Sequence, residues 1–257
     1  MQWIDKMNRL TAENVPYLFV LDFELKNPLV KALHNIKPGN ILYAFNDLSN
    51  ANAGNPQPEP VQIQATPPSA ELFNEKFIQV QREIHAGNTY LLNLCFETPV
   101  KLGSDLESIF YQSYAPYKLW MKNQFVVFSP ESFIKIHDGM VSTFPMKGTL
   151  EKTGDDSEGK LLSDKKESAE HATIADLLRN DLGRVADKIR VKRYRYIDEI
   201  KTPGKIILQV SSEITGMIKP EFTGRPGNLF NEILPAGSVT GAPKEKTVAI
   251  IKDTENF

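Results

Sequence analysis

The sequence predicts an α+β fold built on antiparallel sheets, and two observations carry this prediction. Segments rich in β-branched and aromatic residues occur in clusters that short turns join, which is the pattern of hairpins. Segments with helical periodicity fall between these clusters, whereas a doubly wound parallel sheet would alternate single strands with helices. With 257 residues, the chain is long enough to bury a large core, and we expect a single domain over residues 1–257.

The first third of the chain is expected to contain two strands, a loop and a helix. Residues 15–25 and 40–45 are rich in aliphatic and aromatic side chains and predict the strands. Residues 46–69 are full of Asn, Pro and Gly, which predicts a long surface loop. Ser69 is placed to cap a helix that Gly87 ends. The apolar face of this helix consists of Leu72, Phe73, Phe77, Val80 and Ile84.

The later elements follow from the same patterns. Ser104 and Glu107 have the spacing of a capping box at the start of a helix, and residues 153–159 predict a polar loop. A long helix is expected over about residues 163–185. Further strands are expected at residues 89–100, 118–129, 133–137, 140–146, 188–197 and 205–218.

Composition excludes several classes of partner. The 30 Lys and Arg residues nearly balance the 32 Asp and Glu residues, so no charge excess attracts nucleic acid or an anionic membrane. No apolar run is long enough to span a membrane, and the first residues do not resemble a secretion signal. Cys95 is the only cysteine, which excludes internal disulfides and fits a cytoplasmic protein. One Cys and four His argue against zinc and leave a hard cation held by carboxylates open.

Residues 235–257 contain a glycine-bearing loop that runs into a helix. Pro243 suits the first helical position, where its missing N–H costs nothing. Backbone N–H groups from Gly237 to Gly241 and the positive end of the helix dipole are expected to attract a carboxylate or phosphate. The spacing is not that of a P-loop, so a nucleotide is a poor guess.

Three glutamates fall on apolar stripes of helices. Counting toward the N-terminus in steps of three and four residues, the apolar face of the long helix continues to Glu170 and Glu167. Glu255 shares an apolar stripe with Val248 and Ile251. In the simpler interpretation, the first two complement the helix dipole, worth about 0.3–1 kcal/mol each, and Glu255 lies on a frayed end. In the other, they bind Mg²⁺, which accepts one or two carboxylates and keeps waters. The helical pattern alone leaves both open.

Lys147 and Glu131 each follow a predicted strand. Lys147 lies in FPMKGT beside Gly148, which lets another group approach the backbone closely. Most such lysines are solvated, and a catalytic one needs partial burial so that a neutral amine becomes available. Glu131 by itself is uninformative.

Seven stretches in a fixed order resemble the chorismate-utilising enzymes, most closely their aminodeoxychorismate synthase component I branch. They are AGNTYLLNL, YAPY, SPESF, PMKGT, KESAEHATIADLLRNDLGRV, VSSEITG and PAGSVTGAPK, from about residue 86 onward. The resemblance implies a two-layer antiparallel β-sandwich wrapped by helices. Relatives continue beyond the last motif, so we expect the last strands of that fold to be missing and the chorismate-binding domain to be incomplete at its C-terminus.

The resemblance also implies a Mg²⁺ that binds a carboxylate of chorismate. By motif, Glu170 and Glu255 correspond to metal ligands, and Glu167 and Asp253 to outer carboxylates that act through water. The substrate-binding positions implied by the resemblance are Gly237, Ser238, Thr240, Lys244 and Thr149.

Two catalytic roles follow from the resemblance. Glu131 resembles the general acid/base that helps the 4-hydroxyl leave. Lys147 stands where anthranilate synthases have Ala; in related aminodeoxychorismate synthases this Lys is proposed to attack C2, so that ammonia then adds at C4. Residues 87–91 lack the Lys base of the water-adding relatives. Gln209 stands where many relatives have His, which puts proton transfer at that position in doubt.

The resemblance therefore predicts a subunit that converts chorismate and ammonia to 4-amino-4-deoxychorismate, an aminotransferase-type reaction of p-aminobenzoate and folate biosynthesis. A glutamine amidotransferase partner would supply the ammonia. Two alternatives stay open, namely anthranilate synthase component I and a non-catalytic fragment of the family.

Overall fold

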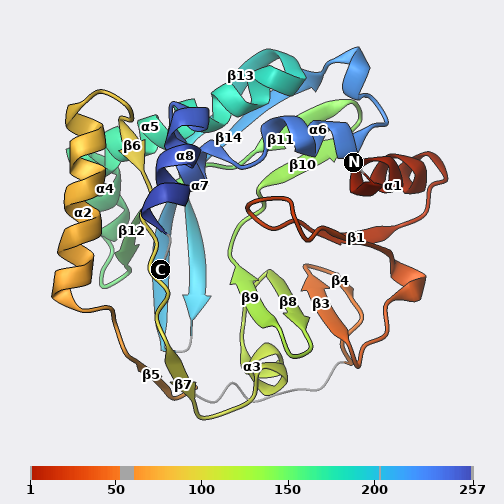
Figure 1. Ribbon diagram of the computed structural model, residues 1–257, viewed down its shortest axis with the longest axis horizontal. Coiled ribbons are helices and arrows are strands. Elements are labelled where there is room, and N and C mark those ends of the chain that lie inside the picture. Colours follow the sequence, from red (N-terminus) through yellow and green to blue (C-terminus); the bar gives the residue numbers. More distant parts are fainter. Residues whose placement is uncertain (1, 53–60, 203, 256–257) are drawn as a thin grey trace. The chain divides into compact units, whose positions relative to one another are not determined.

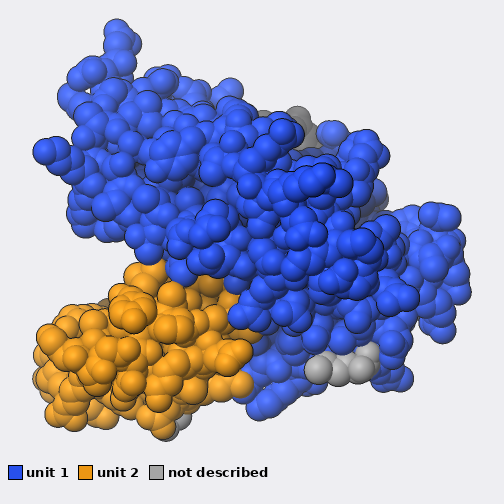
Figure 2. Space-filling model, turned by 90° about the horizontal axis from the view of Figure 1, so that it is seen from above, with its two compact units in different colours: residues 1–60, 105–234 blue, residues 61–104, 235–257 orange. Residues whose placement is uncertain are grey.

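The computed structural model of the protein describes residues 2–52, 61–202 and 204–255. The chain forms two compact units, each built from two segments of sequence (Figures 1 and 2). Unit 1 comprises Met1–Pro60 and Asp105–Leu234, and unit 2 comprises Val61–Ser104 and Pro235–Phe257. Each unit has helices and strands of its own, and the expectation of a single domain stays a prediction.

The main sheet of unit 1 is antiparallel, with β14 (Lys205–Ile218) at its centre (Figure 1). One edge of β14 pairs along its length with β13 (Ala186–Thr202). The other edge pairs with β12 (Met146–Glu151) and β11 (Met140–Thr143), and β10 (Ile134–His137) pairs with β11. Hairpins join β10 to β11 and β13 to β14, and every strand pair of the sheet is antiparallel, which confirms the α+β prediction.

Unit 1 also contains a smaller antiparallel sheet and a separate hairpin. The smaller sheet has the order β4, β3, β8, β9. Its strands are β3 (Ile41–Phe45), β4 (Leu48–Ser49), β8 (Tyr117–Met121) and β9 (Phe125–Ser129). The hairpin consists of β1 (Tyr17–Val20) and β2 (Leu29–Ala32).

One face of the main sheet packs against α5 (Lys165–Val185). Ala175 and Leu182 of α5 form a buried core with Val141 and Ile214 of the sheet. The other α-helices of unit 1 are α1 (Gln2–Ala12), α3 (Leu106–Gln112), α4 (Ser157–Ser163) and α6 (Pro226–Ile233). Because side chains alternate along a strand, the two faces of β14 differ: Leu208, Val210 and Ile214 are buried in the core, whereas Ser211, Glu213 and Thr215 line a cavity.

Unit 2 combines helices with two short strand pairs. Its helices are α2 (Ala70–His85), α7 (Gly237–Thr240) and α8 (Lys244–Thr254). Its strand pairs are β5 (Ile63–Ala65) with β7 (Val100–Leu102), and β6 (Leu91–Leu92) with β15 (Gly241–Ala242). The two segments of unit 2 therefore pair with each other through main-chain hydrogen bonds.

Several strand predictions were too long. The strand expected at residues 15–25 stops at Val20, and the chain turns at Leu25, which has a left-handed φ of 56°. The strand expected at 118–129 is a hairpin, β8 and β9, with the turn at Asn123 (φ 57°). The segment 89–100 pairs only through β6 and at Val100. Aliphatic and aromatic runs continue across turns, so composition alone overestimates strand length.

Two predicted loops contain regular structure. β4 and β5 lie within residues 46–69, of which residues 53–60 are outside the described residues. The polar segment 153–159 leads into α4, which begins at Ser157. The remaining strand predictions and the long helix are confirmed to within a few residues, and α1 was not predicted.

The two predicted helix caps had different outcomes. The hydroxyl of Ser69 accepts a hydrogen bond from the Leu72 N–H (3.2 Å), which confirms it as the cap of α2. The capping box at Ser104 is wrong, because the cap of α3 is Asp105, whose carboxylate accepts from the N–H (2.9 Å) and the hydroxyl (3.0 Å) of Ser108. A carboxylate one residue later outcompetes the hydroxyl because a charged acceptor binds N–H groups more strongly.

Candidate functional site

Lys147 lies in a bulge of β12 in unit 1. Met146 pairs with Ser211 and Thr149 with Gln209, so β12 has one residue more than β14 between these pairs. Gly148 adopts a φ of +94° in this bulge, a conformation that glycine tolerates and other residues resist. The bulge disturbs the regular alternation of side chains at Lys147.

The amine of Lys147 forms an ion pair with Glu170 of α5. The distance from Nζ to Oε2 is 3.2 Å, and Lys166 approaches the other oxygen of Glu170 at 3.5 Å. The hydrogen bond from Lys147 is the main cause that lowers the pKa of Glu170. Both side chains are partly exposed, so a ligand has access to this pair.

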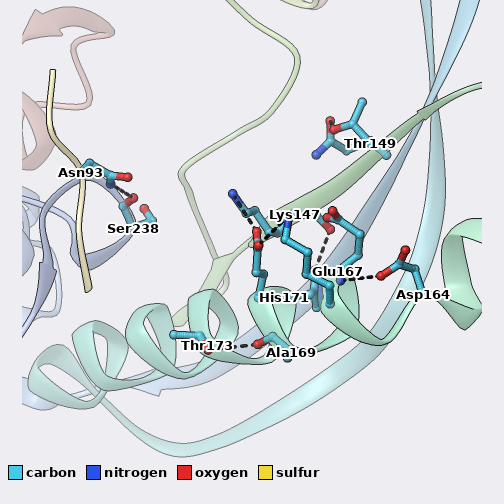
Figure 3. Close-up of polar contacts among 12 residues, drawn as sticks. Asn93, Lys147, Thr149, Asp164, Glu167, Ala169, His171, Thr173 and Ser238 are labelled. Atoms are coloured by element: carbon cyan, nitrogen blue, oxygen red, sulfur yellow. Dashed lines mark hydrogen bonds and ion pairs between the residues drawn. The ribbon is translucent and has the colours of Figure 1, made fainter. Parts of the chain in front are cut away.

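Glu167 is the group that approaches Gly148. A Cβ added to Gly148 would lie 3.3 Å from Oε2 of Glu167, which confirms that this glycine permits a close approach to the backbone. The N–H of Glu167 donates to Asp164 Oδ1 (3.0 Å), the cap of α5. The first turn of α5 is thereby fixed against β12 (Figure 3).

The buried stripe of α5 includes a histidine that the sequence analysis missed. Its buried residues are His171, Ala175, Leu178, Asp181, Leu182 and Val185. His171 is fully buried; Nε2 lies 2.7 Å from the hydroxyl of Ser212, and Nδ1 lies 3.3 Å from the carbonyl of Lys147. Burial is the main cause that lowers the pKa of His171. The motif EH, with His171 four residues before Ala175, contained the signal, since the helical period places it on the stripe.

Glu131 lines a cavity of about 1190 Å³ in unit 1, together with Tyr117, Phe144 and Met146. Part of the residue is exposed, but desolvation of its carboxyl in this cavity raises its pKa from 4.5 to about 7. Within the described part of the chain, the lining of the cavity does not include Lys147. Met146, the neighbour of Lys147 in β12, does line it.

Thr149 and Gln209 are cross-strand partners between β12 and β14. The hydroxyl of Thr149 donates to Oε1 of Gln209 at 3.3 Å. An amide can accept this bond but does not transfer protons in the neutral pH range, so Gln209 keeps Thr149 oriented without acting as a base.

In unit 2, the predicted anion-binding loop forms α7. The N–H groups of Val239 and Thr240 donate to the Ala236 carbonyl, and the N–H of Gly241 donates to the Gly237 carbonyl. The prediction that all N–H groups from Gly237 to Gly241 are available is therefore wrong. The tight helical turn uses these three N–H groups itself.

The side chain of Asn93 holds this turn from outside (Figure 3). Its amide donates to the carbonyls of Ser238 (2.9 Å) and Val239 (2.8 Å). Thr240 is fully buried, and its hydroxyl donates to the Ala236 carbonyl (3.1 Å). The roles of Gly237, Ser238 and Thr240 toward a substrate stay predictions.

The start of α8 and its buried stripe differ from the prediction. Pro243 is the residue that precedes the helix, and Lys244 is the first helical residue. The buried residues of α8 are Thr247, Ile250, Ile251 and Thr254, not the stripe through Val248. The hydroxyl of Thr247 lies 2.8 Å from that of Thr89. The stripe was misplaced because buried threonines were not counted among core residues.

The two acidic residues at the end of α8 each accept a hydrogen bond inside unit 2. Asp253 accepts from the side-chain amide of Gln79 (3.0 Å), and Glu255 accepts from the N–H of Cys95 (2.7 Å). A carboxylate has about four lone-pair sites, so each keeps further acceptor capacity.

The predicted metal ligands thus come from both units, Glu167 and Glu170 from unit 1 and Asp253 and Glu255 from unit 2. Among residues 2–52, 61–202 and 204–255, no group of three or more His, Cys, Asp or Glu residues is arranged to hold a metal ion. All four predicted ligands are carboxylates, which suits a hard cation such as Mg²⁺. The ligand set stays a prediction.

Comparison with known proteins identifies relatives over most of the chain. A family model described as chorismate binding enzyme matches residues 22–257. An uncharacterized PabA-like protein of Haemophilus influenzae is 44% identical over 253 residues, which cover 98% of this chain and 77% of that protein. Aminodeoxychorismate synthase component 1 of Escherichia coli is 32% identical over 197 residues, 72% of this chain and 43% of that protein.

A solved structure supports the same fold. Anthranilate synthase component I from Streptococcus pneumoniae has a TM-score of 0.59 and 23% sequence identity, and the match covers 78% of this chain and 46% of that one. At this identity, the similarity establishes the fold alone. No helix among the described residues has the length and apolar character required to cross a membrane.

Proposed function

Because the chain belongs to the chorismate-binding enzyme family, we propose that it is a synthase subunit that converts chorismate and ammonia to 4-amino-4-deoxychorismate. The observation that carries the proposal is Lys147, which stands in the motif PMKGT and pairs with Glu170 at 3.2 Å. The similarity to aminodeoxychorismate synthase component 1 of Escherichia coli supports the choice of product. In the cell, a glutamine amidotransferase subunit would supply the ammonia, for p-aminobenzoate and folate biosynthesis.

In this proposal, Lys147 is the nucleophile. The nucleophile is the neutral amine, so the group that pairs with Glu170 must lose a proton before it attacks. Attack of the amine on C2 of chorismate shifts the ring double bonds and expels the 4-hydroxyl. Ammonia then adds at C4, the double bonds shift back, and the C2–N bond to Lys147 breaks.

Glu131 would protonate the departing hydroxyl, so that water leaves rather than hydroxide. With a pKa of about 7, its carboxyl is about half protonated at neutral pH, which suits a general acid. Ammonia loses a proton on addition at C4, which restores the proton balance of the reaction.

We propose Mg²⁺ as the cofactor, with Glu170 and Glu255 as direct ligands and Glu167 and Asp253 acting through water. When bound, the ion would supply positive charge for a carboxylate of chorismate. The hydroxyl of Thr149 and the loop residues Ser238 and Thr240, with Gly237 and Lys244, are the further groups that we assign to substrate binding.

The test is the identity of the product. The purified chain is mixed with chorismate, Mg²⁺ and an ammonium salt at mildly alkaline pH, and the products are separated by chromatography. We expect aminodeoxychorismate; anthranilate as the product would replace the proposal with anthranilate synthesis, and no product would contradict catalysis by this chain.

Two lysine variants test the nucleophile. Lys147→Ala should abolish the product, whereas Lys166→Ala, which removes the other cation on Glu170, should retain it. Incubation with chorismate in the absence of ammonium, followed by peptide mass spectrometry, should show an adduct on Lys147. Equal activity of Lys147→Ala and the unmodified chain would contradict the assigned role.

A further inference from the structure

The main chain at Lys147 is held by a buried side chain behind it. A bulge disrupts the hydrogen-bond ladder locally, and here Nδ1 of His171 lies 3.3 Å from the carbonyl oxygen of Lys147. A carbonyl only accepts hydrogen bonds, so Nδ1 carries the proton and donates. The peptide bond that joins Lys147 to Gly148 is therefore attached to α5 by an imidazole ring.

The other nitrogen of His171 is held just as specifically. The N–H of Arg195 donates to the hydroxyl oxygen of Ser212 (2.9 Å), which lies 2.7 Å from Nε2 of His171. A fully buried ring is favoured in its neutral form, so Nε2 accepts the proton of the Ser212 hydroxyl. The hydrogen bonds run in one direction, from Arg195 through Ser212 and His171 to Lys147, and fix the Nδ1–H tautomer.

A strained backbone conformation positions the first donor of this series of hydrogen bonds, the N–H of Arg195. Arg195 has a left-handed φ of 48°, and the register between β13 and β14 shifts between Arg193 and Tyr196. The resulting bulge directs the Arg195 N–H at the side chain of Ser212. A non-glycine residue keeps such a conformation only where neighbouring contacts offset the strain.

This series of hydrogen bonds matters because the residue after Lys147 is glycine. Gly148, at φ +94°, has no Cβ to restrict the adjacent peptide plane. The hydrogen bond from His171 fixes that plane, and with it the direction in which the Lys147 side chain leaves the backbone. Ser212 adds a second restraint, since its N–H donates to the Pro145 carbonyl at 3.0 Å.

We infer that His171, held by the hydroxyl of Ser212 and the backbone of Arg195, is a positioning residue that orients Lys147 through its main-chain carbonyl. This inference rests on the proposed function, in which Lys147 is the nucleophile. His171 does not contact the reacting atoms; it limits the positions that the amine can reach.

Two substitutions of His171 test the hydrogen bonds of its two ring nitrogens separately. In His171→Asn, the amide nitrogen takes the place of Nδ1 and can still donate to the Lys147 carbonyl, whereas in His171→Gln it takes the place of Nε2 and reaches only Ser212. We expect His171→Asn to keep kcat within about threefold of the unmodified chain, and His171→Gln to lower kcat roughly 10- to 100-fold with little change in KM.

Ser212→Ala removes the hydroxyl that fixes the tautomer and should also lower kcat. Its matched control is Ser157→Ala, another buried serine whose hydroxyl donates to a carbonyl, that of Gly154 (2.8 Å), at the start of α4. Ser157→Ala should leave kcat unchanged. Melting temperatures of all variants show whether a loss of activity merely follows a loss of stability.

Nuclear magnetic resonance gives a readout that does not depend on activity. The imidazole nitrogens of His171, assigned by their loss in His171→Asn, should show the Nδ1–H tautomer. The Gly148 amide, which belongs to the tethered peptide, should exchange with solvent faster in His171→Gln than in His171→Asn. If the unmodified chain makes no aminodeoxychorismate, the proposed function fails, while these measurements still decide whether the tether exists.

Three results would overturn the inference. The first is the Nε2–H tautomer. The second is equal exchange of the Gly148 amide in the two His171 variants. The third is an equal loss of kcat in both variants that tracks their melting temperatures.

Discussion

Gly148→Ala is the sharpest test of the architecture around Lys147. The substitution adds one methyl group at a position with φ +94°. The added Cβ would lie 3.3 Å from Oε2 and 3.5 Å from Cβ of Glu167, and 3.5 Å from Cγ2 of Val210. The variant therefore combines backbone strain with a tight contact to one carboxylate.

The expected cost follows from these two terms. A left-handed conformation costs a residue with a Cβ roughly 1–2 kcal/mol. For a domain of this size, that lowers the melting temperature by roughly 2–8 °C. The contact at 3.3 Å displaces the flexible carboxylate of Glu167 by a few tenths of an ångström rather than adding a large penalty.

Gly139→Ala provides the matched control, because Gly139 has a φ of +71° and no atom within 4 Å of an added Cβ. Both variants should lose comparable stability in urea unfolding. Only Gly148→Ala should alter a Mg²⁺ titration by calorimetry, since only this variant moves Glu167. Combining each variant with Glu167→Ala should give a coupling free energy above about 0.5 kcal/mol for Gly148→Ala and none for Gly139→Ala.

Two outcomes would refute this reasoning. Unchanged stability of Gly148→Ala would show that the bulge does not need a left-handed residue. A coupling to Glu167→Ala that is the same for both glycine variants would show that Glu167 does not pack on Gly148.

Three further predictions concern other parts of the molecule. The pKa of Glu131 is about 7 in the folded state and 4.5 ordinarily, so the folded state binds more protons than the unfolded state between these pH values. The contribution of Glu131 to stability is therefore present below about pH 4.5 and is lost as the pH rises through about 7. Glu131→Gln should flatten this part of the curve of unfolding free energy against pH, measured by urea unfolding. Asp105→Ala should lower the urea midpoint because it removes the cap of α3, whereas Ser104→Ala should leave the midpoint unchanged. A larger loss of stability in Ser104→Ala than in Asp105→Ala would support the capping box at Ser104 instead. In unit 2, Thr89→Val should cost about 1–3 kcal/mol because it leaves the buried Thr247 hydroxyl without its partner. Thr247→Val should cost less, because the Thr89 hydroxyl also donates to the carbonyls of Leu91 (3.1 Å) and Ala242 (3.0 Å). The double variant should cost less than the sum, and strict additivity would argue against the bond between them.

The long helices were predictable because their periodicity is strong and their caps are local. The Ser69 hydroxyl accepts from an N–H only three residues later in the chain, so the start of α2 can be derived without tertiary information. Strand ends were less predictable, because turns such as those at Leu25 and Asn123 use non-glycine residues in left-handed conformations. Such positions lack the glycine that normally indicates a turn.

The candidate site was predictable where chemistry follows from single motifs. Glu167 and Gly148 were recognised separately, but their contact depends on how α5 packs on β12. His171 was missed because a buried histidine looks like an ordinary polar residue in sequence, and its partner Ser212 lies 41 residues away. Tertiary contacts of this kind have no local sequence signature.

The two-segment construction of unit 2 has a consequence for the order of events during synthesis. The hydroxyl of Thr89 bonds to that of Thr247, 158 residues later in the chain. At a translation rate of about 5–20 residues per second, roughly 8 to 30 seconds separate the two residues at the ribosome. During that interval α2 and β6 have been synthesised but β15 and α8 have not. The first segment of unit 2 therefore lacks the second segment, with which it pairs, while the intervening segment, Asp105–Leu234 of unit 1, is synthesised. Segments of this kind are where chaperones act on a nascent chain.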